Sequence, residues 1–170
     1  MELLPVVPWT VWLCWHDCRE RRLPNWLTIG GALVALTWRL GYGGLESLVA
    51  GFAAAALAGL FLFIPFLLHG AGAGDVKMLF AAGAIVGWPQ LPVLLLATSL
   101  AGVAVVVVML IGKRLNPARL GHWTRCLFDW RYDRAAGRVG LPAADSEEVR
   151  VPFSLAIGAG LLFSLLVFSL

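Results

Sequence analysis

The sequence predicts an all-α, polytopic membrane protein with about six transmembrane helices. Of its 170 residues, 60% are hydrophobic and only 14% are charged, and its mean hydropathy is +0.84. Soluble domains contain about 45–50% apolar and about 25% charged residues. The apolar residues gather into six segments separated by turns, and the basic residues gather in alternate loops. We therefore expect lipid to solvate much of the apolar surface.

Six apolar segments define the expected spans in chain order. Leu3–Trp15 follows Glu2 without a basic region and lacks a small-residue cleavage site, so we expect a retained helix and not a signal peptide. The third span has about the 20 residues that a bilayer requires, but the fourth has only about 13, or roughly 20 Å as a helix. Turns are expected at Gly41–Gly44 and Pro89–Pro92. The remaining spans are Trp26–Trp38 or Leu40, Leu48–Leu68, Val76–Trp88, Val93–Ile111 and Val151–Leu170.

The chain is expected to form a single membrane-embedded domain, 1–170, with one long polar loop at 113–150. Within this loop, apolar residues recur at helical spacing near several arginines. Pro117–Arg134 is therefore interpreted either as an amphipathic helix on the membrane surface or as a small lid packed between spans.

The basic residues favour one orientation in the membrane. Twelve of the thirteen Lys and Arg residues lie in the first loop, in the glycine-rich break 70–77 or in the loop 113–150, and only Arg39 lies on the opposite side. Because basic residues near span ends are retained in the cytoplasm, these loops are expected to be cytoplasmic and both termini to face outside. The net charge of +3 therefore requires no nucleic-acid partner.

Asp17 and Asp75 stand at the cytoplasmic ends of two apolar segments. Only about 15 residues precede Asp17, so the first helix is expected to continue past it or to thin the bilayer. Asp75 follows Gly72-Ala73-Gly74, which we expect to be non-helical. The short segment after Asp75 is expected to hold this residue several ångströms inside the bilayer. An ionisable residue at such a depth is a functional candidate.

Each carboxylate also has a purely structural interpretation. Asp75 is suited to cap the fourth helix by accepting backbone N–H bonds, and Asp17 to pair with Arg21 one helical turn later. However, both acids end apolar segments on the same expected side. If they lie within hydrogen-bond reach, they share one proton. One carboxylate then acts as a base on water and the other as an acid toward a carbonyl oxygen, as in aspartic proteases.

The residues around the two acids resemble a known family. Asp17–Thr28 (DCRERRLPNWLT) resembles the first-aspartate motif of bacterial prepilin peptidases, the type IV leader peptidases. Gly72–Lys77 (GAGDVK) resembles their G-x-G-D-x-K motif. Arg150–Phe153 (RVPF), followed by Gly158 and Gly160, is similar to their closing segment. The resemblance covers most of the chain, with the motifs in the family's order.

This resemblance implies a GxGD-type intramembrane aspartic endopeptidase in the bacterial inner membrane. It implies that Asp17 and Asp75 are the catalytic pair, and that the partner is a prepilin or pseudopilin whose basic leader is removed at the cytoplasmic face, after a glycine. No cofactor is implied. The cysteines Cys14, Cys18 and Cys126 form no paired C-x-x-C sites, so we interpret them as ordinary thiols and expect no metal.

Three further residues are expected to shape the site. Gly72 and Gly74 would let an extended substrate approach the backbone closely, although a plain helix-breaking hinge explains them as well. Lys77 is suited to bias the charge of the two acids or to bind substrate, but a lysine retained by the positive-inside rule is the alternative. Pro24 and Asn25 are expected to make the turn into the second helix.

The chain also departs from the larger family members. Those carry a further cytoplasmic region with two C-x-x-C pairs and N-methyltransferase activity, for which there is no room between the first span and Asp17. We therefore expect peptidase activity alone, as in the short enzymes of Flp/Tad-type pili. Two rival interpretations remain: a presenilin-type or signal-peptide-peptidase-type protease, which shares G-x-G-D, and a non-enzymatic transporter or assembly scaffold whose carboxylates relay protons.

Overall fold

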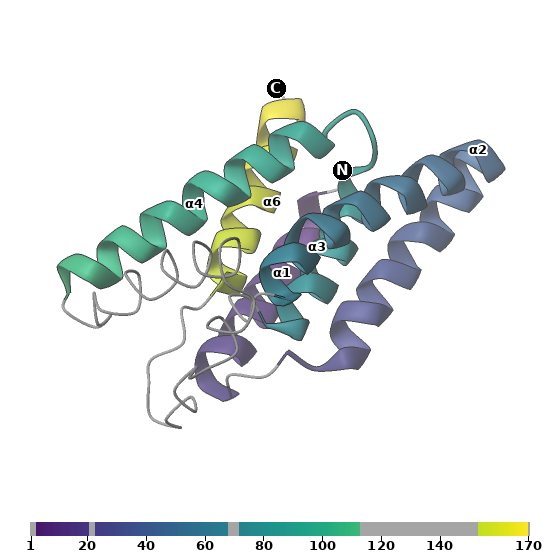
Figure 1. Cartoon of the computed structure of the whole chain (residues 1–170). Helices are drawn as coiled ribbons and strands as arrows, with labels where there is room; N and C mark the ends of the chain where they lie inside the picture. The colour runs from purple at the N-terminus through teal and green to yellow at the C-terminus, as the bar shows by residue number, and fades with distance from the viewer. Residues whose placement is uncertain (1–2, 21–22, 68–71, 113–152, 170) are drawn as a thin grey trace, which may run out of the picture. The chain divides into compact units, whose positions relative to one another are not determined.

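The computed structural model describes residues 3–20, 23–67, 72–112 and 153–169, and these ranges contain helices and no strands. The long polar loop 113–150, with its alternative interpretations as a surface helix or a lid, lies outside the described residues, as does Arg21. Figure 1 shows the described helices: α1 (Leu3–Glu20), α2 (Asn25–Leu67), α3 (Ala73–Val86), α4 (Leu91–Ile111) and α6 (Phe153–Ser169).

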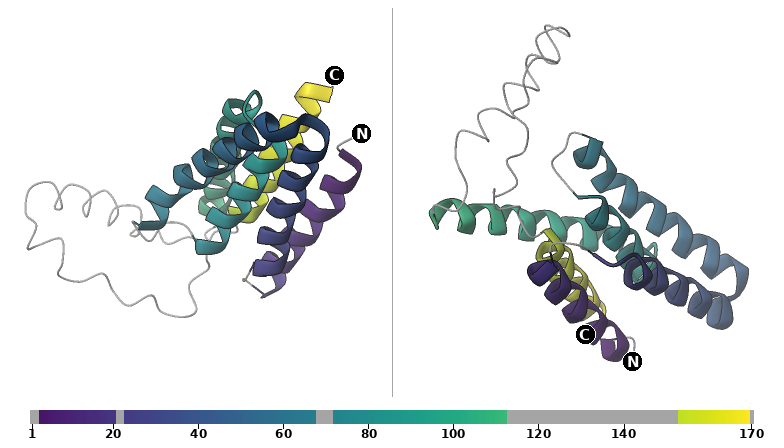
Figure 2. Two further views of the ribbon diagram at one scale, coloured as in Figure 1. Left: turned by 90° about the vertical axis from the view of Figure 1, so that its right-hand side faces the viewer. Right: turned by 90° about the horizontal axis from the view of Figure 1, so that it is seen from below.

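Most described helices belong to one compact unit, formed by residues 1–103 and 152–170. A second unit comprises residues 104–151, and the structure describes only the end of α4 and Gly112 in it. Within the first unit, α3 packs mainly against α2, and α6 packs against α1 and α3. The two views of Figure 2 show α1 and α6 side by side. The prediction of a single domain stays a prediction.

The helix boundaries confirm two expectations. α1 continues through Asp17 to Glu20, as the short stretch before Asp17 required. α2 is a hairpin of two arms, because Gly44 interrupts it with φ 66° and ψ −163°. This positive φ is accessible to glycine at little cost. The expected turn therefore lies at Gly44, and each arm has about the 20 residues needed to cross a bilayer. Figure 1 shows the two arms running back beside one another.

Small residues bring α3 against the second arm of α2. α3 buries Ala81, Ala82, Gly83 and Ala84, and α2 presents Ala54, Ala55 and Ala58 at no solvent exposure. A Cβ atom added at Gly83 would lie 2.8 Å from the Ala54 carbonyl oxygen and 2.8 Å from the Ala58 Cβ. Helices in membranes associate in this way, because small residues let their backbones approach closely. Since α3 carries Asp75, this packing also fixes the position of that carboxylate.

Arg39 holds the other end of α3. From the first arm of α2, its Nε donates to the Ala84 carbonyl oxygen at 2.8 Å and its Nη2 to the Ile85 carbonyl oxygen at 2.9 Å. The last carbonyl groups of a helix lack partners within it and carry partial negative charge. The helix ends at Gly87, whose φ of 78° places it in the left-handed region, and the Arg39 guanidinium lies directly over this glycine.

Replacing Arg39 with alanine is expected to destabilise the protein by about 1–2 kcal/mol, because two half-buried hydrogen bonds to carbonyl groups are lost. Thermal unfolding in detergent, followed by circular dichroism, measures the change. Thr37→Ala is the matched control, because the Thr37 hydroxyl bonds only to carbonyl groups of its own helix. Equal stability of the Arg39 and Thr37 variants would contradict a capping role for Arg39.

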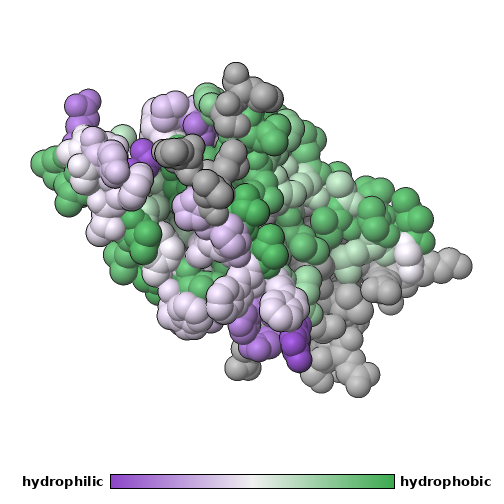
Figure 3. Space-filling model, turned by 180° about the vertical axis from the view of Figure 1, so that it is seen from behind, coloured by the Kyte–Doolittle hydropathy of each residue, from purple (hydrophilic) through white to green (hydrophobic). Residues whose placement is uncertain are grey.

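The described surface is suited to lipid. By length and composition, two helical stretches are able to cross a membrane, Asn25–Phe63 and Leu91–Met109, and Phe153–Phe168 is apolar but shorter. Large apolar side chains such as Trp15, Val34 and Val108 are more than half exposed. On the face drawn in Figure 3, hydrophobic residues dominate the right-hand part, and paler to hydrophilic residues form a band from the upper left to the bottom. A patch of this extent is unusual on a soluble monomer. The six-span topology stays a prediction.

Candidate functional site

Several helix ends meet at one end of the first unit. The last turns of α1 carry Asp17, the first turn of α3 carries Asp75, and the first turn of α6 carries Ser154. The short connection between α1 and α2 adds Leu23. These segments are distant in the sequence, so the site exists only because the hairpin of α2 and the packing of α6 bring them together.

Asp17 is half-buried and is bound by α6. The Ser154 hydroxyl donates a hydrogen bond to Asp17 Oδ2, and the serine side chain is completely buried. One turn earlier in α1, the Cys14 Sγ donates to the Ser154 carbonyl oxygen at 3.5 Å. These two contacts fasten the start of α6 to the end of α1. The described free thiols are Cys14, which is half-buried, and Cys18, which is exposed; Cys126 lies outside the described residues.

Asp75 is half-buried in the first turn of α3. Its Oδ2 accepts a hydrogen bond of 3.0 Å from the Gly72 backbone N–H. Gly72 is extended, with φ −83° and ψ 150°, and precedes the first helical residue, Ala73. Our expectation that Gly72-Ala73-Gly74 is entirely non-helical is therefore wrong for Ala73 and Gly74. Asp75 is also not the N-cap residue itself; it bonds back from the third helical position, where the exposed N–H groups and the helix dipole favour a carboxylate.

Asp17 and Asp75 stand on helices that both pack against α6. Gly74, the residue before Asp75, lies against Leu23, six residues beyond Asp17. Two carboxylates held close together in a region of low dielectric would favour one shared proton, which is what the dyad hypothesis requires. The catalytic pairing of Asp17 with Asp75 stays a prediction.

The structure gives both motif glycines contacts within the protein. A Cβ at Gly72 would lie 3.1 Å from Asp75 Oδ2, so a side chain there would crowd the carboxylate. A Cβ at Gly74 would lie 3.1 Å from both Cβ and Cδ1 of Leu23. Gly72 thus permits Asp75 to fold back on the helix start, and Gly74 permits α3 to pack against the α1–α2 connection. Their contact with substrate stays a prediction.

Lys77 connects α3 to the start of α2. Its Nζ donates to Asn25 Oδ1 at 2.8 Å. Within the described part of the chain, no ion pair joins Lys77 to Asp17 or Asp75. Pro24 and Asn25 form the turn into α2 as expected, since the Pro24 carbonyl oxygen accepts the N–H groups of Leu27 and Thr28 at 3.1 and 3.2 Å. A role of Lys77 in substrate binding stays a prediction.

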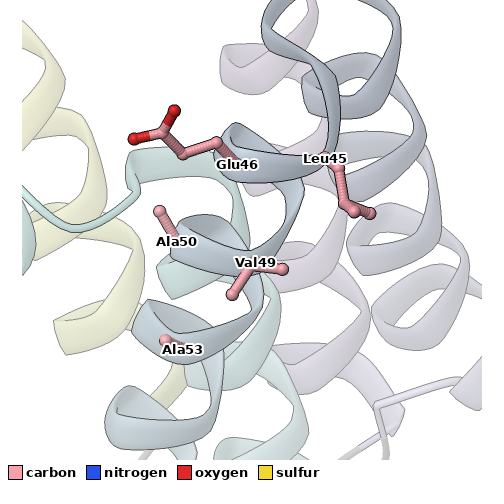
Figure 4. Close-up of a pocket in the computed structure, with 5 residues that line it drawn as sticks. All are labelled: Leu45, Glu46, Val49, Ala50 and Ala53. Atoms are coloured by element: carbon pink, nitrogen blue, oxygen red, sulfur yellow. The ribbon is translucent and has the colours of Figure 1, made fainter.

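The open apolar hollow drawn in Figure 4 lies away from these acids. It is lined by the second arm of α2 from Leu45 to Ala53, and Glu46 contributes the single charged side chain. Gly51, in this same stretch, lies against Arg39, which caps the end of α3 opposite Asp75. Among the described residues, no group of three or more His, Cys, Asp or Glu side chains is placed to hold a metal ion.

Sequence reasoning missed Ser154 and Arg39. Ser154 is a hydroxyl in the first turn of an otherwise apolar helix, directly after Val151-Pro152-Phe153. Its position at the start of the last apolar segment is the feature of the sequence that could have identified it. Arg39 was counted only as the basic residue on the opposite side, although a lone arginine in an apolar hairpin must find buried partners. Recognising these partners requires the packing of α3 and α6.

Two sequence comparisons match the chain to known proteins. The family model described as "Type IV leader peptidase family" matches residues 4–107. A curated relative, the prepilin leader peptidase/N-methyltransferase of Escherichia coli (strain K12), is 32% identical over 115 residues. This alignment covers 63% of the chain and 51% of the relative, so the chain spans about half of that protein's length. No solved structure matches the chain.

Proposed function

Since the chain belongs to the type IV leader peptidase family, whose model covers residues 4–107, we propose that it is an aspartic endopeptidase that removes the basic leader of type IV prepilins or pseudopilins. One structural observation supports this most directly: Asp17 in the last turns of α1 and Asp75 in the first turn of α3 lie on helices that both pack against α6. These two acids lie in the motifs that resemble the family's catalytic aspartates. The substrate class follows from the family and from the relative's name.

The proposed chemistry needs only the two carboxylates and water. The charged carboxylate takes a proton from a water molecule, whose oxygen then bonds to the carbonyl carbon of the leader's terminal glycine. The protonated carboxylate gives its proton to the carbonyl oxygen. The tetrahedral intermediate collapses as the C–N bond breaks. The departing amine takes up a proton from the carboxylate that had acted as base, and the other carboxylate takes back a proton from one of the two hydroxyl groups, which restores the starting pair. Because the two acids titrate as a pair, the assignment of base and acid to Asp17 and Asp75 stays open.

The site is proposed to face the cytoplasm from the inner membrane. Arg19, in the last turn of α1, and Lys77, near the start of α3, flank the two acids in the sequence, and basic residues near span ends are retained in the cytoplasm. α3 has 14 residues, or roughly 20 Å at 1.5 Å per residue, which is less than the roughly 30 Å hydrocarbon thickness. Its amino-terminal end therefore lies below the membrane surface if the opposite end reaches the outer interface, and water enters from the cytoplasmic side.

Co-expression with a type IV prepilin tests this function. We expect the leader to be removed, which is read as an increased mobility on gel electrophoresis and as a loss of mass in mass spectrometry. A prepilin whose glycine before the scissile bond is replaced by a bulky residue is the control and should stay uncleaved. We also expect the new amino terminus to be unmethylated. A panel of prepilins that all keep their leaders, with the protein folded in the membrane, would favour a non-enzymatic role.

A further inference from the structure

The buried hydroxyl of Ser154 has a specific partner in the candidate site. Ser154 is 0% exposed, and a buried hydroxyl needs a hydrogen-bond partner to offset its lost hydration. It donates to Asp17 Oδ2, across 137 positions of sequence. We propose that Ser154 is a positioning residue, which holds the Asp17 carboxylate in the orientation required for proton transfer. This inference rests on the proposed function, because it assigns Asp17 a part in the reaction.

The backbone around Ser154 is held independently of its hydroxyl. The Cys14 thiol bonds to the Ser154 carbonyl oxygen at 3.5 Å. One turn further along α6, a Cβ at Gly158 would lie 2.9 Å from the Cys14 Sγ and 3.0 Å from the Thr10 Cγ2. The missing side chain of Gly158 therefore lets α6 approach α1 closely. Removal of the Ser154 hydroxyl should leave this helix contact in place.

An aspartate at this position needs such a contact. Asp17 is half-buried in the last turns of α1, where its side chain can rotate about two bonds. Catalytic groups work when they are held within about 0.5 Å of the productive geometry. Gly72 supplies an equivalent contact for Asp75 through its backbone N–H. With Ser154, each acid has a donor among the described residues that fixes its orientation.

Ser154→Ala is expected to lower kcat about 10- to 100-fold, the equivalent of one lost hydrogen bond to a charged group, with KM changed less than about twofold. KM is expected to stay nearly unchanged because Ser154 acts through Asp17 and is not assigned a contact with substrate. Ser154→Thr keeps the hydroxyl and is expected to recover most of kcat. Ser164→Ala is the matched control, since Ser164 is equally buried on α6 and its hydroxyl has no hydrogen-bond partner among the described residues.

A spectroscopic measurement tests the contact without reference to activity. In infrared difference spectra, Ser154→Ala is expected to shift a carboxyl band relative to wild type. The same substitution in an Asp17→Asn background should produce no such shift. A band shift that persists in that background, or a kcat of Ser154→Ala within twofold of wild type, would overturn the positioning role. If the Ala and Thr variants lose kcat and thermal stability to the same extent, Ser154 contributes packing alone. This result would also overturn the positioning role. Failure of the wild-type protein to cleave any prepilin would instead refute the proposed function.

Discussion

Asp75→Asn and Asp17→Asn are each expected to slow leader removal by at least about 10³-fold, because an amide has nearly the shape of a carboxylate but cannot carry its charge or exchange its proton. The double variant should be scarcely slower than either single variant, since the two acids act as a unit. The measurement is the single-turnover rate of leader removal in membranes or detergent. Both variants should insert and fold normally, since asparagine keeps hydrogen-bond acceptors for Ser154 and Gly72.

Glu20→Gln is the matched control for these variants. Glu20 lies in α1 three residues beyond Asp17, is largely exposed, and pairs with His16 one turn earlier. Exposed pairs of this kind contribute about 0–1 kcal/mol, so neither stability nor cleavage should change appreciably. If either aspartate variant cleaves prepilin at a rate close to that of the Glu20 variant, the assignment of the catalytic pair is wrong.

Gly83→Ala is expected to destabilise the protein by about 2–3 kcal/mol, because the added Cβ overpacks a close contact between helices. The new atom would meet the Ala54 carbonyl oxygen and the Ala58 Cβ, each at 2.8 Å, and neither can rotate away. α3 must then move away from α2, and Asp75 moves with it. We therefore expect leader removal to fall together with the unfolding temperature measured in detergent.

Gly30→Ala provides the comparison for this helix contact. Gly30 also lies in α2, but a Cβ built there has no heavy atom within 4 Å. Its stability should change by no more than about 0.5 kcal/mol. A Gly83 variant as stable as the Gly30 variant would show that α3 does not pack against α2 through Ala54 and Ala58.

Much of the fold could be predicted because lipid-facing helices leave plain signals in the sequence. The extension of α1 through Asp17 followed from its length, and the break at Gly44 followed from a cluster of glycines. The same reasoning failed at Ala73 and Gly74. Glycines there suggested irregular backbone, but the Asp75 carboxylate bonds to the Gly72 N–H and starts the helix earlier than expected.

Only part of the candidate site could be predicted, because a residue stands out in an apolar segment by its charge and not by its packing. Asp17 and Asp75 stand out because charge is rare in apolar segments. Ser154 does not stand out, because α6 is apolar on all sides and its pattern does not reveal which face meets α1. The contacts of Gly158 with Cys14 and Thr10 determine which face of α6 meets α1. These contacts depend on distances between the helix backbones, which a hydropathy pattern does not reveal.

The hydrogen bonds to the two acids make the two oxygen atoms of each carboxylate unequal. In both residues the described donor, Ser154 or the Gly72 N–H, binds Oδ2. Because Oδ2 of each acid is already engaged by a donor from the protein, the proposed exchange of protons with water would fall to Oδ1 of each residue.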